Sequence, residues 1–323
     1  MITPSDYKDR YVNLKVYLDN GRSKTVSVHK YLMKSLGYHP EGDGAFKAAL
    51  RTHGMDMVLR VDTGSGINLV DRKLNDRELK MRNKSHLDLS LSEERSDGSV
   101  VISTQADKAI TDATGKKKIG EKFTERDWFS MAHYCFLGKG SPEACQVVLQ
   151  LAHHWGLTDE AHLQDYVDKW LGVDCNGFVG NYLFHVVQEN PWTDIGVQYW
   201  DYGPDVTIDG YFDHRKPYLT AWEQMVAGKS YLMGKVKDGV IVQGGGGADT
   251  AGHIVITQPN DRAGRPGGKF AIRCIESTFG HTREGFVDNY YTFKSVSGKV
   301  FTVDRGPGMK PGHKEMDVVI AAV

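Results

Sequence analysis

The chain has few cysteines, and they form no recognisable framework. Four of its 323 residues are cysteine, at the irregularly spaced positions 135, 145, 175 and 274. No C-x-x-C pair occurs, which argues against a zinc ribbon or thioredoxin chemistry. A chain of this length can bury a core without disulfides, so we expect reduced thiols. A cysteine in an unusual sequence context then calls for a specific explanation.

The chain also lacks an excess of charge and any long apolar run. Its 40 lysine and arginine residues nearly balance its 41 aspartate and glutamate residues, which favours neither nucleic acid nor an anionic membrane surface as a partner. No run of about 18 apolar residues occurs, so we expect no membrane span. The first residues lack the basic and apolar segments of a secretory signal. We expect a protein made in the cytoplasm that would need a specialised export route to act outside it.

The chain divides near residue 120 into two regions with different hydrophobic patterns. Residues 1–120 are predicted to be β-rich, because alternating runs flank turn signals such as Asn20-Gly21. This region carries no catalytic constellation. Residues 121–323 begin with helical patterns and continue with short β-branched or aromatic runs between glycine-rich turns. Helices followed by a run of strands indicate an α+β domain with a mainly antiparallel sheet.

Helix caps and strand patterns place the elements of residues 121–323. Three predicted helices begin after a hydroxyl residue that can cap them, namely Thr124, Ser141 and Thr158. Gly156 and Gly172 are predicted to end the second and third of these helices. The predicted strands lie in residues 205–212, 230–243, 252–259, 268–278, 290–304 and 316–323. The glycine-rich residues 243–253 are predicted to form a lip beside a histidine.

The segment "DCNGFVGNYL" places Cys175 at the start of a further predicted helix. Asp174 can cap that helix, and Gly177 lets the backbone pass close to another group. A thiol in a first helical turn has a lowered pKa and lies beside backbone N–H groups that can hold an oxyanion. This pattern favours a nucleophile. The alternative is a buried structural cysteine, which is common for free cysteines.

The stretch "DCNGFV" resembles the Asp-Cys-Ser-Gly-Phe/Leu-Val motif of the NlpC-type cysteine peptidases. This papain-like family mostly cuts peptide stems in bacterial cell walls. Asn176 stands where the family usually has serine. The stretch "AGHIVITQP" resembles the family's second motif, in which a glycine precedes the catalytic histidine at the start of a strand. Gly252 and His253 match that motif, and they follow the cysteine in the order the family has.

A third residue follows on the next predicted strand. Glu276 falls where the family's orienting residue would fall, and a carboxylate that accepts the imidazole N–H would hold the histidine tautomer. The alternative is a surface glutamate near a strand end. The site that the resemblance implies has Cys175 as nucleophile, His253 as base, Glu276 as orienting group, and Asp174, Asn176 and Gly177 in support of the oxyanion.

The resemblance also implies a fold, a function and partners. The implied fold is a papain-like α+β domain over residues 121–323, with an antiparallel sheet packed on the cysteine-bearing helix. The implied function is a cysteine hydrolase that cleaves amide bonds in peptidoglycan stem peptides without a metal or cofactor. As an antibacterial effector acting in the periplasm or on the cell wall, it would have an immunity protein as a partner.

Two alternatives remain open at this point. One is a papain-like toxin that acts on proteins as a protease, deamidase or acyltransferase. The other is a non-catalytic binding protein on a degenerate papain-like fold.

Overall fold

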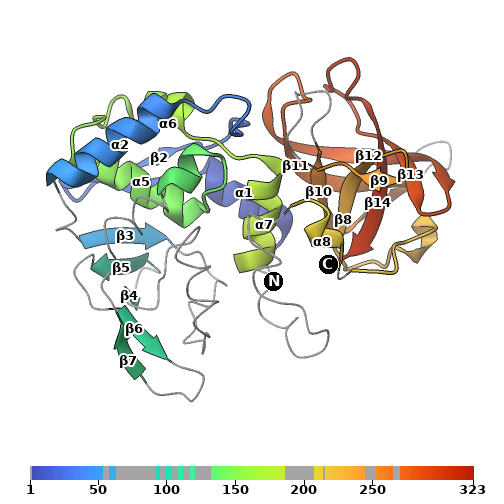
Figure 1. Cartoon of the computed structure of the whole chain (residues 1–323), viewed down its shortest axis with the longest axis horizontal. Helices are drawn as coiled ribbons and strands as arrows, with labels where there is room; N and C mark the ends of the chain where they lie inside the picture. Colours follow the sequence, from blue (N-terminus) through green and yellow to red (C-terminus); the bar gives the residue numbers. More distant parts are fainter. Residues whose placement is uncertain are drawn as a thin grey trace. The chain divides into compact units, whose positions relative to one another are not determined.

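The computed structural model describes most of the chain as two compact units. The described residues are 2–53, 58–62, 92–94, 99–103, 108–111, 117–120, 132–185, 207–213, 215–243, 252–264 and 270–323. The first unit, here called the barrel unit, combines Met1–Lys8 with Val173–Val323. The second unit is Asp9–Gly172 (Figure 1). The domain boundary predicted between residues 120 and 121 stays a prediction, and the compact units divide after Gly172.

The second unit contains helices and short antiparallel sheets. Its helices are α2 (Pro40–His53), α5 (Pro142–His154) and α6 (Leu163–Trp170), and α1 (Pro4–Val12) begins in the barrel unit and ends here. Its strands are β1 (Leu14–Tyr17), β2 (Ser23–Val26), β3 (Val58–Asp62), β4 (Ser92–Glu94), β5 (Ser99–Ser103), β6 (Lys108–Thr111) and β7 (Lys117–Gly120). The predicted hairpin around Asn20-Gly21 is confirmed, because β1 and β2 pair antiparallel on either side of it.

The helix caps predicted in this unit had mixed outcomes. The Ser141 side chain accepts a hydrogen bond from the Ala144 backbone N–H at 3.2 Å, which confirms the predicted start of α5. The prediction that Thr158 caps the next helix is wrong, since α6 begins at Leu163. The Asp159 carboxylate instead accepts the His162 backbone N–H at 2.9 Å, and this local bond holds a turn where the helix was expected. The predicted cap Thr124 lies outside the described residues.

The barrel unit is built on a closed antiparallel barrel (Figure 1). Its strands are β8 (Tyr231–Lys237), β9 (Val240–Ile241), β10 (Ile254–Gly264), β11 (Phe270–Thr278), β12 (Gly285–Ser297), β13 (Val300–Asp304) and β14 (Glu315–Ala322). Strands β10 to β14 pair in sequence order, and β14 pairs with β8. Because β8 also pairs with β10, the ring of six strands closes. Strand β9 extends the β8 edge as a short hairpin.

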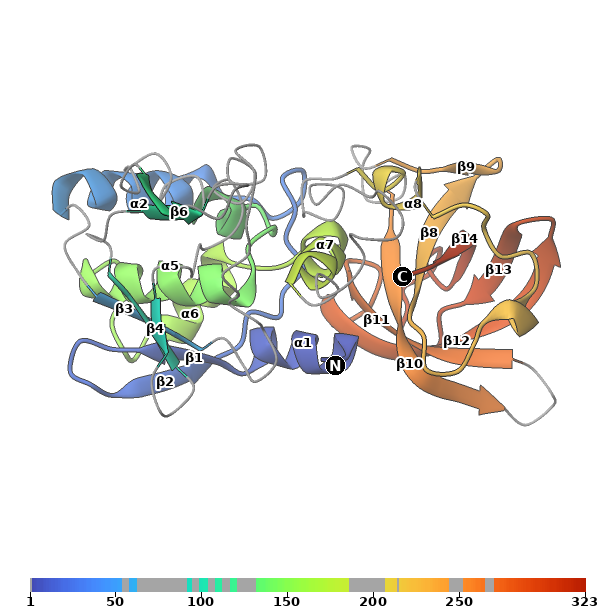
Figure 2. The same ribbon diagram turned by 90° about the horizontal axis from the view of Figure 1, so that it is seen from below.

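This closure shows that the predicted papain-like α+β fold is wrong. That fold required a sheet packed as a layer on the cysteine-bearing helix. Here the inward-facing side chains of the six strands pack against one another inside the barrel, and the helix α7 (Cys175–His185) lies outside, against β10 and β11 (Figure 1 and Figure 2). The barrel core is formed by buried residues that include Met233, Val255, Ile272, Cys274, Tyr291, Phe301 and Ile320.

The strands predicted at residues 230–243, 252–259, 268–278, 290–304 and 316–323 all correspond to strands of this barrel unit. The strand predicted at residues 205–212 is wrong, since the short helix α8 (Gly210–Asp213) occupies its end. The Asp209 carboxylate accepts from the Thr207 hydroxyl at 2.5 Å and from the Gly210 N–H at 2.9 Å, which turns the chain. Tyr211 and Phe212 are both fully buried, so the alternation that a half-exposed strand requires is absent.

Candidate functional site in the barrel unit

The start of α7 has the local structure that the sequence predicts. The Asp174 carboxylate accepts the Gly177 backbone N–H at 2.5 Å, and the Asp174 carbonyl accepts the first helical N–H, from Phe178, at 3.0 Å. Asp174 is therefore the cap of this helix. Cys175 follows it as the first helical residue, in the first turn of α7.

Exposure distinguishes Cys175 from the other cysteines. The Cys175 residue is 5 % exposed, whereas Cys135, Cys145 and Cys274 are each 0 % exposed. The Cys175 thiol donates a long hydrogen bond of 3.9 Å to the side-chain oxygen of Asn176. Asn176, which stands where the NlpC-type motif usually has serine, thus lies beside the sulfur. Cys175 is the most accessible thiol of the chain.

A buried hydrogen bond ties the start of α7 to the end of β11. The Ser277 hydroxyl donates to the Val173 carbonyl oxygen at 2.5 Å, across 104 residues of sequence. Consecutive side chains of a strand point to opposite faces. Ser277 therefore faces the helix outside the barrel, and the preceding residue, Glu276, faces the barrel interior. This single bond brings the Cys175 turn and the Glu276 position to the same end of the same strand.

His253 lies immediately before β10, at this same end of the barrel. Its backbone carbonyl accepts the Lys235 N–H of β8 at 2.9 Å. The preceding glycine is required by packing, because a Cβ atom on Gly252 would lie 2.1 Å from the Val242 carbonyl oxygen. These contacts fix the backbone from which the imidazole projects, and His253 is 8 % exposed. The predicted lip before it lies largely outside the described residues, at residues 244–251.

The His253 ring is paired with the Glu276 carboxylate. Its Nε2 atom makes a short hydrogen bond to Glu276 Oε2. Glu276 is fully buried, so the alternative that it is a surface glutamate is wrong. In the register of the barrel, β10 starts where β11 ends, because the two strands run antiparallel. That pairing explains how two residues 23 positions apart in sequence meet at one end of the barrel.

Sequence reasoning missed Arg305, which completes this cluster. Its guanidinium makes a short ion pair with Glu276 Oε2 and donates to the Thr278 hydroxyl at 3.0 Å. Its Nε donates to the Tyr291 hydroxyl at 3.0 Å, and its Nη1 donates to the His313 carbonyl at 3.1 Å. Arg305 follows β13 directly in the turn sequence "RGPG". An arginine beside a turn is usually exposed, and only the barrel register places this one inside.

Burial and charge together set the ionisation of this cluster. Burial by itself raises the pKa of Glu276, but the adjacent Arg305 guanidinium and the hydrogen bond from His253 outweigh it and lower that pKa to about 2. Burial lowers the pKa of His253, and this effect outweighs the neighbouring Glu276 carboxylate, which raises the same pKa. The charges of Arg305 and Lys235 lower the pKa of His253 further. At neutral pH the cluster therefore holds an ionised carboxylate, a charged guanidinium and a neutral imidazole.

This ionisation selects one imidazole tautomer. A lone pair on Nε2 would face the negative carboxylate oxygen, so Nε2 carries the proton and donates it to Glu276. The other ring nitrogen, Nδ1, then carries a lone pair. Among the described residues, the ring makes its hydrogen bond through Nε2, to Glu276, and Arg305 Nη2, 3.3 Å from Nε2, is a second donor to the same carboxylate oxygen. The arrangement is that of an oriented neutral base, able to accept a proton at Nδ1.

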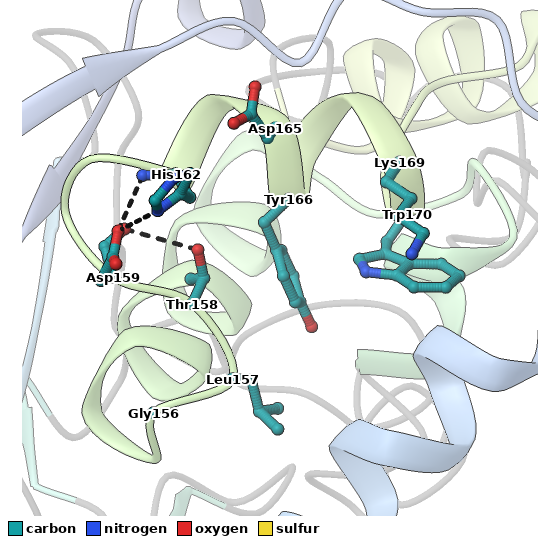
Figure 3. Close-up of a pocket in the computed structure, with 9 residues that line it drawn as sticks. All are labelled: Gly156, Leu157, Thr158, Asp159, His162, Asp165, Tyr166, Lys169 and Trp170. Atoms are coloured by element: carbon teal, nitrogen blue, oxygen red, sulfur yellow. Dashed lines mark hydrogen bonds and ion pairs between the residues drawn. The ribbon is translucent and has the colours of Figure 1, made fainter.

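A separate hollow of about 510 Å³ lies on the second unit, along α6. Figure 3 shows the residues that line it, among them Asp159, His162, Tyr166 and Trp170. The Asp159 carboxylate is already engaged by the backbone N–H and the ring of His162, at 2.9 and 2.7 Å. None of the residues predicted to be catalytic lines this hollow. The candidate site is therefore placed in the barrel unit.

Comparisons with protein-family models, curated proteins and solved structures found no match for this chain. Within the described ranges, no group of three or more His, Cys, Asp or Glu side chains is arranged to hold a metal ion. No helix in the described part of the chain has both the length and the apolar character that crossing a bilayer requires.

Proposed function

We propose that this protein is a cysteine hydrolase that cleaves amide bonds, with Cys175 as nucleophile, His253 as general base and Glu276 as the residue that orients the base. The observation that carries the proposal is the buried His253–Glu276–Arg305 chain at the end of the barrel to which the start of α7 is bonded. A structural histidine has no need of a buried ion pair behind it, and such pairs are costly to build. A base that must stay neutral and correctly oriented benefits from one.

The proposed reaction balances without a cofactor. The Cys175 thiol gives its proton to His253 Nδ1, and the thiolate sulfur attacks the carbonyl carbon of the amide. The backbone N–H of Cys175 is the proposed donor to the resulting oxyanion, because the Gly177 N–H of the same turn already donates to Asp174. Collapse breaks the C–N bond, and the imidazolium returns its proton to the leaving amine. Water, deprotonated by His253, then hydrolyses the thioester and releases the carboxylic acid and the free thiol.

The substrate class rests on the resemblance of the two motifs alone, because a catalytic trio does not determine a substrate. "DCNGFV" and "AGHIVITQP" resemble motifs of NlpC-type enzymes, and on that ground we propose peptidoglycan stem peptides as the substrate. An effector that acts on a rival cell's wall, with an immunity protein as its partner, is the biological role consistent with this substrate. Cleavage or modification of proteins by the same trio is the competing outcome.

Thiol alkylation tests the activation of Cys175. The native protein is treated briefly with iodoacetamide at pH 7, and each cysteine is quantified by peptide mass mapping. We expect Cys175 to be labelled fastest, and the His253→Gln variant to label it at least about 10-fold more slowly, because the thiolate loses its base. The variant is the essential control, since Cys175 is also the most exposed cysteine. Equal labelling of Cys175 in the two proteins would overturn its role as an activated nucleophile.

Incubation with purified sacculi tests the substrate. We expect wild-type protein to release peptide fragments that mass spectrometry detects and that the Cys175→Ala variant does not release. A parallel incubation with denatured protein substrates covers the competing outcome. Fragments from proteins, with none from sacculi, would replace the wall substrate by a protein substrate while leaving the cysteine chemistry in place. No difference from Cys175→Ala in either incubation would argue for a non-catalytic role.

A further inference from the structure

Arg305 is buried at the end of the barrel, and its guanidinium is held by several hydrogen bonds. It is 4 % exposed, and its guanidinium lies between three elements of the barrel end. Its partners are Glu276 and Thr278 on β11, Tyr291 on β12, and the His313 carbonyl before β14. Its Nη2 atom also lies 3.3 Å from His253 Nε2. Each of the three guanidinium nitrogens therefore has a fixed partner, so the fork cannot rotate without breaking several hydrogen bonds at once.

The geometry around Glu276 Oε2 explains how the Arg305 guanidinium sets the tautomer of His253. Two N–H donors, one from Arg305 and one from His253, converge on the same carboxylate oxygen. Because the guanidinium is always charged, the carboxylate remains ionised even when the imidazole titrates. An ionised carboxylate cannot give a proton to the ring, so Nε2 keeps its proton. The lone pair stays on Nδ1, which is the atom that the proposed reaction needs.

We propose that Arg305 is a positioning residue for the hydrolysis proposed above. It holds Glu276 as an ionised acceptor and thereby fixes His253 in the Nε2–H form. This inference rests on the proposed function. In the proposed reaction, Arg305 does not touch the reacting atoms and acts only through Glu276 and His253. The resemblance to NlpC-type motifs contains no counterpart of this arginine; its placement follows from the barrel register alone, in which Arg305 comes one residue after the last β13 pairing with β12.

The titration of His253 is set by groups on several strands. Glu276 on β11 favours the charged imidazolium, whereas Arg305 and Lys235, on β8, disfavour it. Tyr291 and Cys274 face the same space from the barrel interior, and burial raises the pKa of both, so they stay neutral near pH 7. Replacing Arg305 by an uncharged residue removes one of the two opposing cations. The pKa of His253 then rises, and the neutral base is lost at a higher pH.

The test compares Arg305→Met, Arg305→Lys and Arg10→Met. Arg10→Met is the matched control, because Arg10 forms a buried ion pair with Glu143 and both residues belong to the second unit, not to the barrel unit. The imidazole nitrogens of uniformly ¹⁵N-labelled histidine are followed by NMR from pH 4 to 9, and the His253 signals are assigned with His253→Gln. In wild type we expect the Nε2–H tautomer. In Arg305→Met we expect a His253 titration at higher pH, a matching shift of the acidic limb of kcat/KM, and about a 100-fold loss of kcat/KM.

Arg305→Lys, which keeps the charge, is expected to restore the titration of His253, and Arg10→Met to leave it unchanged. A folded Arg305→Met protein whose His253 titrates as in wild type would overturn the role of Arg305. The tautomer of the wild-type protein needs no variant, so an Nδ1–H form there would overturn it even if Arg305→Met does not fold. Failure of the proposed function has a different outcome: no Cys175-dependent hydrolysis in wild type, whatever the NMR titration of His253 shows.

Discussion

At the scale of single residues, the buried cluster is defined by one carboxylate that serves two donors. Glu276 accepts from His253 and from Arg305 through the same oxygen, in an environment fully closed to solvent. Removing one partner of a buried ion pair is strongly destabilising, because the remaining charge has no compensation. The cluster should therefore contribute to the stability of the barrel unit as well as to the proposed chemistry.

The first prediction concerns Glu276→Gln and pH. Because the pKa of Glu276 is lowered from 4.5 to about 2 in the folded protein, its carboxylate stabilises the fold above pH 4.5, and this contribution is lost as the pH falls toward 2. We expect Glu276→Gln to lower the free energy of unfolding by roughly 3 kcal/mol at pH 7. The difference in unfolding free energy between wild type and Glu276→Gln should shrink as the pH falls from 4.5 to 2. Urea unfolding at each pH, followed by near-ultraviolet circular dichroism of the buried aromatic rings, measures it.

The control for this prediction is Glu315→Gln. Glu315 forms an exposed ion pair with Lys294 on the outside of the barrel. Exposed pairs of this kind contribute at most about 1 kcal/mol. A loss in Glu276→Gln that is no larger than in Glu315→Gln, or that is the same at pH 7 and pH 3, would contradict the ionisation assigned to Glu276.

At the scale of elements, the position of His253 depends on a close backbone approach before β10. The chain at Gly252 passes against backbone atoms of Val242 and Gln243, which cannot rotate away, and against the end of the Ile208 side chain. The cap of α7 and the bond from Ser277 to Val173 fix the start of α7 in the same way. The candidate site is thus assembled by the ends of elements, each fixed by one or two local contacts.

The second prediction is that Gly252→Ala is destabilising and impairs the site. Its Cβ would lie 2.1 Å from the Val242 oxygen and 2.9 Å from the Gln243 carbonyl carbon, so the backbone before β10 must move. We expect a loss of about 1–3 kcal/mol in unfolding free energy and a displaced His253 titration. Gly44→Ala in α2 is the matched control, because a Cβ there meets nothing within 4 Å. That substitution should be neutral or stabilising by up to about 1 kcal/mol, since alanine favours helix.

At the scale of the whole molecule, helix α1 contributes to both compact units. Its first residues belong to the barrel unit, where fully buried Tyr7 packs against Phe178 and Tyr182 of α7. One turn later, fully buried Tyr11 belongs to the second unit and donates to the Gly140 carbonyl at 2.9 Å. Each unit also contains two of the four cysteines, which makes the stability of each unit separately measurable.

The third prediction compares Tyr7→Ala with Tyr11→Ala. Each removes a fully buried aromatic ring, which costs about 3–5 kcal/mol. In urea, with brief alkylation and mass mapping, Tyr7→Ala should expose Cys274 at lower urea while leaving Cys145 protected nearly as in wild type. Tyr11→Ala should do the reverse. If Tyr7→Ala instead exposed Cys145 first, the assignment of residues 1–8 to the barrel unit would be wrong.

Local sequence signals predicted those parts of the fold that local chemistry determines. Asn20-Gly21 predicted a hairpin, Ser141 predicted the start of α5, and Asp174 predicted the cap of α7, and all three are confirmed. The same signals missed α2, whose glycines disfavour a helix and whose stability comes from burying Phe46 and Leu50. They misplaced the start of α6, because Asp159 competes with Thr158 for the local N–H groups.

The sequence by itself determined the Ser141 and Asp174 caps, the Asn20-Gly21 hairpin and most of the barrel strands. It also supplied the identity of the residues proposed as nucleophile, base and orienting group. Only the tertiary structure decided that the strands close into a barrel, because closure requires β8 to pair with both β14 and β10, and neither pairing has a local signal. The same closure buries Arg305 beside Glu276, although Arg305 follows a strand as a surface arginine would. Register between distant strands sets such contacts, and no pattern along one segment encodes it.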